Sequence, residues 1–170
     1  MKLTDLFLEE LEKEAAATRR VLEQVPDGHA DWKPHEKSMT MGRLSSLVAT
    51  MPSWIYMMID QDELNLTPGQ PNSYEQRGLD TAKKLLEAHD EEVAKAKASL
   101  ARTNEEHLMT KWRLKVHGNV VNENVRYSMI QSAVFNHWSH HRGQLTVYLR
   151  LNDAMVPAIY GPSADDARFD

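Results

Sequence analysis

Two histidines in the last quarter of the chain have the residue type and the spacing of metal ligands. His137 and His141 lie four residues apart within the sequence NHWSHHRGQ, at positions 136–144. Side chains four apart share one face of an α-helix, and the spacing continues through a mostly apolar stripe of Ile130, Val134, His137, His141, Leu145 and Tyr148. Imidazole nitrogens in an apolar interior need partners. A divalent metal ion is one such partner, so the stripe suggests a metal site inside a helical protein.

The same stripe has an interpretation without a metal. Two core histidines can hydrogen-bond to each other or to water, and the residues alone favour this reading of the pair. His89 is a candidate third ligand, although a buried histidine bonded to a neighbouring polar group explains it more simply. Arg142 and Gln144 are candidates to contact the ligands or a substrate carboxylate, with surface solvation as the alternative for Arg142. His140 lies about 100° around the helix from His141 and is expected at the edge of the bundle or in a subunit contact.

Composition and charge argue against several other functions. The 170 residues carry a net charge of −5, whereas nucleic-acid binding needs a basic surface. Without cysteine the chain has no disulfide, thiolate ligand or cysteine nucleophile. No glycine-rich phosphate loop is present, so no nucleotide cofactor is expected. No apolar run has the length of a membrane span, and the first residues lack an apolar signal core, so we expect a soluble, cytoplasmic protein.

Four segments with a helical period must position these side chains. Helices are expected at residues 4–25, from 38 or 40 to 58, at 74–101 and at 125–152. Ser38 and Thr40 can each cap the second helix, and Pro52 predicts a kink or a break within it. The third segment contains His89, and the fourth contains the histidine pair.

The connections between these segments predict the architecture. Residues 64–73 contain two prolines and a glycine, which predicts a long irregular crossover between the second and third helices. Alternating apolar residues around Gly118 and Asn119, within residues 112–121, predict a short β-hairpin before the fourth helix. Nothing in the composition divides the chain. We therefore expect a single domain over residues 1–170, of the all-α class, folded as a four-helix bundle.

Three parts of the sequence carry a resemblance to a known family. They are the helix-two opening SMTMGRL at 38–44, the NHWSHHRGQ segment, and the ending from YLRLN at 148–152 to YGPS at 160–163. With them, nearly the whole chain resembles the DinB/YfiT-like superfamily of metal-dependent four-helix bundles. The resemblance implies a nickel or zinc ion held by three histidines, two of which correspond to His137 and His141. The third corresponds to Leu47, which has no atom that can bind a metal. The implied site is thus an incomplete histidine triad, to be completed by His89, water or substrate.

The resemblance leaves three classes of function open. Relatives that are thiol-dependent transferases and isomerases imply a thiol-transferase-like or hydrolase-like enzyme, in which the ion activates a thiol or water. The leucine at position 47 instead implies a non-catalytic bundle that binds a small ligand or acts as an interaction protein. Nucleic-acid binding is suggested only by the family name and is opposed by the acidic charge. The resemblance also implies a homodimer, and no feature of the chain indicates the substrate.

Overall fold

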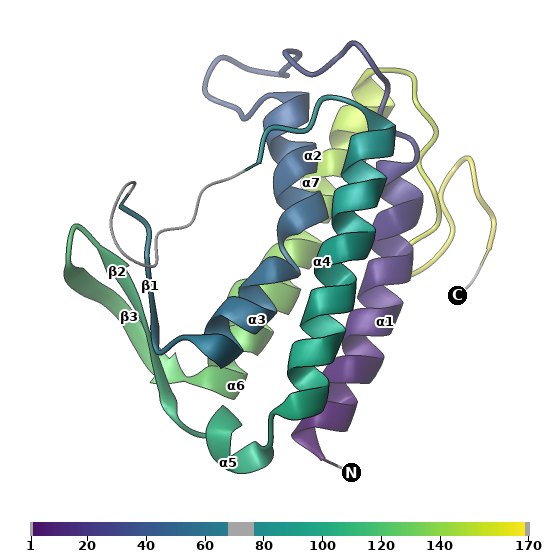
Figure 1. The fold of residues 1–170 in the computed structure, drawn as a ribbon. Helices are drawn as coiled ribbons and strands as arrows, with labels where there is room; N and C mark the ends of the chain where they lie inside the picture. The colour runs from purple at the N-terminus through teal and green to yellow at the C-terminus, as the bar shows by residue number, and fades with distance from the viewer. Residues whose placement is uncertain (1, 68–76, 169–170) are drawn as a thin grey trace.

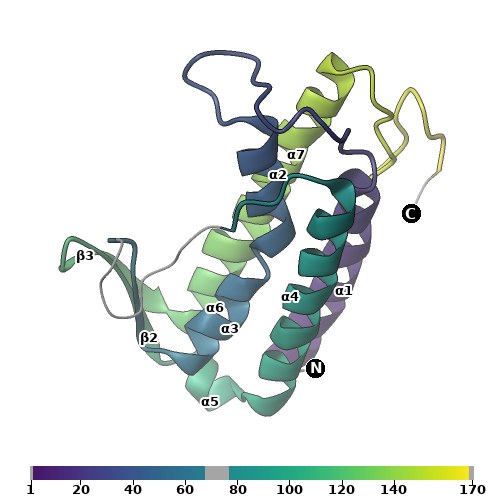
Figure 2. The same ribbon diagram turned by 45° about the horizontal axis from the view of Figure 1, so that its top comes forward.

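The structure is a computed structural model that describes residues 2–67 and 77–168. Long helices run side by side along the molecule, and a small sheet lies at one end, next to α5 and α6 (Figures 1 and 2). The elements of the described residues are α1 (Leu3–Leu22), α2 (Met41–Thr50), α3 (Ser53–Asp60), β1 (Glu63–Asn65), α4 (Ala82–Arg102), α5 (Glu105–Leu108), β2 (Lys111–Val116), β3 (Asn119–Val125), α6 (Arg126–Met129), the π-helical segment η1 (Ile130–Asn136) and α7 (His137–Leu151). The chain is thus mostly helical.

The second predicted helix is interrupted at the proline, as its sequence indicates. The hydroxyl of Thr40 accepts a hydrogen bond from the Arg43 amide, so Thr40 and not Ser38 is the cap of α2. Helix α2 ends at Thr50 and α3 begins at Ser53. Pro52 lies between them. It interrupts the helix because proline has no N–H to continue the hydrogen-bond ladder.

The third helix begins later than predicted. Its first residues, 74–76, lie outside the described residues, but residues 77–80 are not helical and α4 starts at Ala82. Thr81 caps α4 by accepting a hydrogen bond from the Lys84 amide. Leu79, which the sequence placed on the helix, instead lies in the loop, where its amide donates to the Ser46 hydroxyl at 2.9 Å. The apolar period in the sequence therefore begins in the loop that precedes α4, before the helix itself starts.

The β-hairpin is confirmed, and the structure adds a strand to it. Strands β2 and β3 are antiparallel, and the turn between them uses positive φ angles at His117 and Gly118. Strand β1 pairs with β2 in parallel, so the sheet order is β1-β2-β3. The prediction of irregular chain was wrong for residues 64 and 65, and its later part, 68–73, lies outside the described residues. The predicted all-α class therefore leaves out this three-stranded sheet. Strand β1 could not be predicted because a strand of three residues is too short to show an alternating pattern.

The fourth predicted helix is continuous from Arg126 to Leu151 but contains the π-helical segment η1. Of the predicted stripe, only His137 is half-buried and the other five residues are buried, and the buried side also includes Trp138 and Arg142, which are 0% and 1% exposed. The indole N–H of Trp138 donates to the Val48 carbonyl at 2.8 Å, which ties α7 to α2. None of the described helices has the combination of length and apolar character that crossing a bilayer requires.

Candidate functional site

The two histidines of the last helix contact each other directly. The Nε2 atoms of His137 and His141 lie 2.8 Å apart, and the ring centroids are separated by 4.5 Å. His141 is buried and His137 half-buried. Trp54 from α3 packs against His137, with 5.5 Å between the ring centroids. The neighbouring His140 is exposed, as predicted. The pair therefore lies at the margin of the core, with its Nε2 atoms directed at one another.

The outer ring nitrogen of His141 is held by a side chain of the same helix. The Nδ1 atom of His141 lies 2.7 Å from the Oε1 atom of Gln144, so the structure brings Gln144 into contact with the pair. The backbone carbonyl of Ala133 raises the pKa of His137 and partly offsets the effect of burial. Gln144 thereby orients the ring of His141.

The contacts of the pair have two chemical readings. Burial lowers the pKa of His137 and of His141. A neutral imidazole carries one N–H and one lone pair. One ring can therefore donate its Nε2–H to the Nε2 of the other, or a cation between the two Nε2 atoms can accept a lone pair from each ring.

His89 is placed away from the pair. It is 1% exposed, and its Nε2 and Nδ1 lie 3.1 Å and 3.4 Å from the carbonyl oxygens of Ala15 and Ala49. Burial lowers its pKa, so the neutral ring donates one N–H, and the shorter contact identifies Ala15 as the acceptor. Across residues 2–67 and 77–168, no three His, Cys, Asp or Glu side chains are grouped to hold a metal ion. The structure therefore does not group His89 with His137 and His141 as a third ligand.

The position expected for a third histidine is occupied by Leu47. Helices α2–α3 and α7 run antiparallel, because Tyr148 donates to the Met39 carbonyl at one end and Trp54 packs on His137 towards the other. Leu47 lies in α2, between Met39 and Trp54 along the chain. Its side chain is partly buried against the core and offers no donor atom.

Arg142 does not contact the histidines, although it follows His141 directly. It is 1% exposed and faces α1, where its Nη2 lies 2.5 Å from the Glu14 carboxylate. Its Nη1 donates to the Glu14 carbonyl at 3.1 Å and to the Thr18 hydroxyl at 3.0 Å. Neither surface solvation nor contact with the histidine pair describes this side chain. Arg142 instead joins the last helix to the first.

The sequence analysis missed the groups that surround this arginine. The hydroxyl of Tyr160 lies 2.9 Å from the Glu14 carboxylate and 2.9 Å from the Ser139 hydroxyl, and it also accepts a hydrogen bond from Arg142. One signal was present. Glu14 lies three residues after Leu11 on the apolar side of the first helix, and a carboxylate buried there needs a cation.

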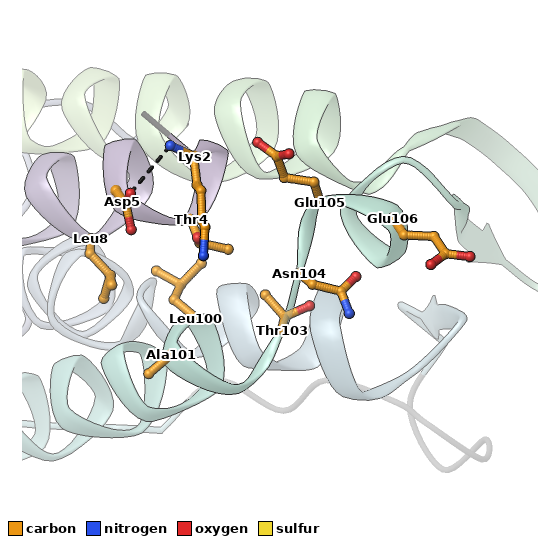
Figure 3. A pocket seen from close by; sticks show the side chains of 10 residues that line it. All are labelled: Lys2, Thr4, Asp5, Leu8, Leu100, Ala101, Thr103, Asn104, Glu105 and Glu106. Carbon is orange, nitrogen blue, oxygen red and sulfur yellow. Dashed lines mark hydrogen bonds between the residues drawn. The ribbon is translucent and has the colours of Figure 1, made fainter.

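The hollow shown in Figure 3 shares no residue with the histidine pair. It measures about 600 Å³ and lies where the start of α1 meets the end of α4 and α5. Two of its three carboxylates are bound to backbone amides at the start of α1, because Asp5 accepts from Lys2 and Glu105 accepts from Leu3. These contacts satisfy the amino-terminal N–H groups of α1. Asp5 and Glu105 at this hollow therefore serve to cap the start of α1.

Comparison with known proteins defines the class of this fold. A DinB-like protein (YjoA) from Bacillus subtilis has a similar solved structure, with a TM-score of 0.65 and 21% identity over 88% of this chain and 93% of that one. A DinB-like protein from Bacillus cereus ATCC 10987 has a TM-score of 0.66 and 20% identity over 91% and 95% of the two chains. The DinB-like fold that the resemblance implied is thus confirmed.

The sequence comparisons extend this likeness to the family. The uncharacterized protein YrdA of Bacillus subtilis (strain 168) is 26% identical over 167 residues, which cover 97% of this chain and 93% of YrdA. The model of the DinB family matches residues 1–168. The chain belongs to the DinB family.

Proposed function

We propose that this DinB-family protein is a metal-dependent enzyme of thiol-transferase or hydrolase type whose ion is held by the Nε2 atoms of His137 and His141. The single observation that carries the proposal is the arrangement of the ring nitrogens: two Nε2 atoms 2.8 Å apart, and the Nδ1 atom of His141 2.7 Å from the side-chain oxygen of Gln144. Metal-bound histidines characteristically donate their other N–H to a carbonyl or amide oxygen. The proposal takes the long helical segments as a four-helix bundle that supports this site.

The donor set fits a borderline metal ion with open coordination positions. Imidazole nitrogens suit zinc and nickel, and zinc–nitrogen bonds are about 2.0–2.1 Å. The two Nε2 atoms, now 2.8 Å apart, would have to move apart slightly to hold one such ion. With Leu47 on the facing helix, the remaining ligands would come from water or from the substrate. Bound there, the ion would act as a Lewis acid that activates water or a thiol.

The chain's own residues would orient the ligands and limit the access of water. Gln144 fixes the rotation of the His141 ring. Trp54 covers one side of His137. These contacts restrict where a small molecule can approach the pair, and that restriction is the structural basis for any substrate selectivity.

The experiment that tests this proposal is calorimetric titration of protein made without a histidine tag, with ZnCl₂ and with NiCl₂. We expect one site per chain in the parent protein. His141→Ala should abolish saturable binding, whereas His140→Ala, which removes the exposed neighbour on the same helix, should leave it intact. The proposal fails if the parent protein binds neither ion, or if the two variants bind alike.

A second candidate function is a non-catalytic bundle, and two observations favour it. Leu47 removes the third ligand, and a separation of 2.8 Å between the Nε2 atoms is that of an N–H···N hydrogen bond. In this alternative the pair is satisfied internally, and the protein binds a small ligand or acts as an interaction protein. A parent protein that is silent in both titrations, together with a Leu47→His variant that binds zinc, would support this candidate over the first.

A further inference from the structure

A second hollow lies where the segment after α7 folds back beside α1 (Figures 1 and 2). It measures about 480 Å³, which is within the size range of pockets for small molecules. Residues 159 and 160 form one side of it, and the other side is the α1 face of Lys13, Glu14, Ala16, Ala17 and Arg20. The hollow shares no residue with the histidine pair, so it is a separate candidate site.

One carboxylate oxygen at this hollow has no hydrogen-bond partner among the described residues. Glu14 is only 6% exposed. Its Oε2 atom lies 2.5 Å from the Nη2 atom of Arg142 and accepts a hydrogen bond from the Tyr160 hydroxyl at 2.9 Å. No hydrogen bond within residues 2–67 and 77–168 reaches its Oε1 atom. Oxygens of buried carboxylates need donors, and a ligand in the hollow can supply one from an O–H or N–H group.

The ring of Tyr160 forms a fixed wall of the hollow. Tyr160 is 70% exposed, yet its hydroxyl contacts Glu14, Ser139 and Arg142 at once. A side chain that is already anchored loses little conformational entropy when a ligand packs against it. On α1, the hollow is lined by small side chains at positions 16 and 17. These surfaces suit a flat, apolar body such as an aromatic ring.

The charges around the hollow select the sign of the ligand. Lys13 and Arg20 line it, and the guanidinium carbon of Arg142 lies 5.2 Å from the centroid of the Tyr160 ring. Lys13 also pairs with the exposed Glu9 at 2.8 Å. A further cation would be repelled by the lysine and the two arginines, whereas an anionic group would be attracted. A guanidinium can bind a carboxylate with two parallel hydrogen bonds, which makes Arg20 the favoured partner.

We propose that this hollow binds a small aromatic carboxylate that also carries a hydroxyl group. The hydroxyl donates to the Oε1 atom of Glu14, the ring packs against Tyr160, and the carboxylate binds Arg20. Glu14 and Arg20 are six residues apart, or about 9 Å along the helix axis, a distance that the ligand and the long arginine side chain span together. Arg20 donates to the Ala158 carbonyl at 3.3 Å, a contact that keeps its guanidinium near the hollow. The site does not depend on the proposed metal.

The test is methyl nuclear magnetic resonance of the full chain labelled at alanine, because Ala16 and Ala17 line the hollow. Three probes are titrated at pH 7: 4-hydroxybenzoate, benzoate, which lacks the hydroxyl, and 4-hydroxybenzamide, which lacks the charge. We expect 4-hydroxybenzoate to shift both methyl signals saturably and the other two probes to bind about tenfold more weakly. No saturable shift with 4-hydroxybenzoate would overturn the proposal. Benzoate of equal affinity would overturn the role of Glu14, and 4-hydroxybenzamide of equal affinity would overturn the anionic class of ligand.

Substitution of Arg20 tests where the carboxylate binds. Arg20→Gln keeps a donor for the Ala158 carbonyl but removes the charge, so this variant should bind 4-hydroxybenzoate and 4-hydroxybenzamide with similar affinity. The matched control is Arg19→Gln, which removes the neighbouring cation that pairs with Glu23 and Asp90. The control should keep the preference for the charged probe. An Arg20→Gln variant with the same preference would contradict the role given to Arg20.

Discussion

The guanidinium of Arg142 lies 2.5 Å from the carboxylate of Glu14 and joins the last helix to the first in the protein interior. The two side chains are 1% and 8% exposed. Thr18 and Tyr160 complete the hydrogen bonds of the pair. Buried charges of this kind are tolerated only when they are paired and fully hydrogen-bonded. The ion pair therefore fixes α7 against α1, on the side of α7 away from the histidines.

Loss of the Arg142 side-chain charge should strongly destabilise the protein. Arg142→Met leaves the Glu14 carboxylate buried without a cation, and breaking a buried pair in this way costs about 3–5 kcal/mol. The free energy of unfolding is measured by urea denaturation at pH 7. Arg150→Met is the matched control, because Arg150 lies on the same helix and forms an exposed pair with Asp165. Comparable losses in the two variants would contradict the role given to Arg142.

His89 should make the protein less stable in mild acid. Burial lowers the pKa of His89 below its ordinary value of 6.5 in the folded protein. In the unfolded chain His89 takes up a proton near pH 6.5, so below that pH the unfolded state binds more protons and stability falls. The fall continues until the pH reaches the lowered pKa of the folded protein, with a slope of up to about 1.4 kcal/mol per pH unit.

The measurement is the free energy of unfolding of the parent protein and of His89→Gln at pH 7 and pH 5. Glutamine can still donate to the Ala15 carbonyl but does not titrate. The variant should therefore lose less stability between the two pH values, even if it is less stable at pH 7. His137 and His141 contribute in the same direction, because burial lowers their pKa as well. An unchanged pH dependence in His89→Gln would show that the acid sensitivity arises elsewhere.

Leu47→His should create a stronger metal site if the register of α2 against α7 is as described. The new imidazole would lie opposite the histidine pair and supply a third ligand. Because groups that only orient ligands are worth about 10–100-fold in affinity, a direct ligand should raise zinc affinity by at least about 100-fold. Leu47→Ala controls for the lost leucine volume. A Leu47→His variant with the affinity of Leu47→Ala would show that position 47 does not face the pair.

The homodimer implied by the resemblance stays a prediction, and the outer face of α7 is where it can be tested. Val147 and Leu151 are 57% and 56% exposed on this face. Exposed apolar side chains on neighbouring turns favour association. Light scattering at micromolar concentration should give the mass of a dimer for the parent protein and of a monomer for Val147→Glu combined with Leu151→Glu. A monomeric parent protein would contradict the prediction.

Local signals in the sequence predicted the helices and the hairpin. They could not predict pairing between segments that lie far apart along the chain. Thr40 and Pro52 each act through a group within a few residues, so their effects were predictable. Strand β1 depends on pairing Leu64 with Leu114, which is far away along the chain. The start of α4 was predicted too early because Leu79 is buried by a loop contact with Ser46, and an apolar period does not distinguish loop burial from helix burial.

For the candidate site, the spacing of the histidines was sufficient to predict their contact but not their surroundings. Residues four apart on a helix must meet, and His137 and His141 do. The π-helical segment changes the phase of the helix before His137, and no residue type marks such a segment in the sequence. The burial of Arg142 depends on Glu14 in the first helix, so the position of that arginine required the folded structure.

The most direct test of the proposed metal site is anomalous X-ray diffraction at the zinc absorption edge, from crystals of tag-free protein soaked in ZnCl₂. The account predicts one strong peak per chain, within bonding distance of the Nε2 atoms of both His137 and His141. A map without density between the two rings at full soaking, or with peaks only at exposed histidines such as His140, would contradict it.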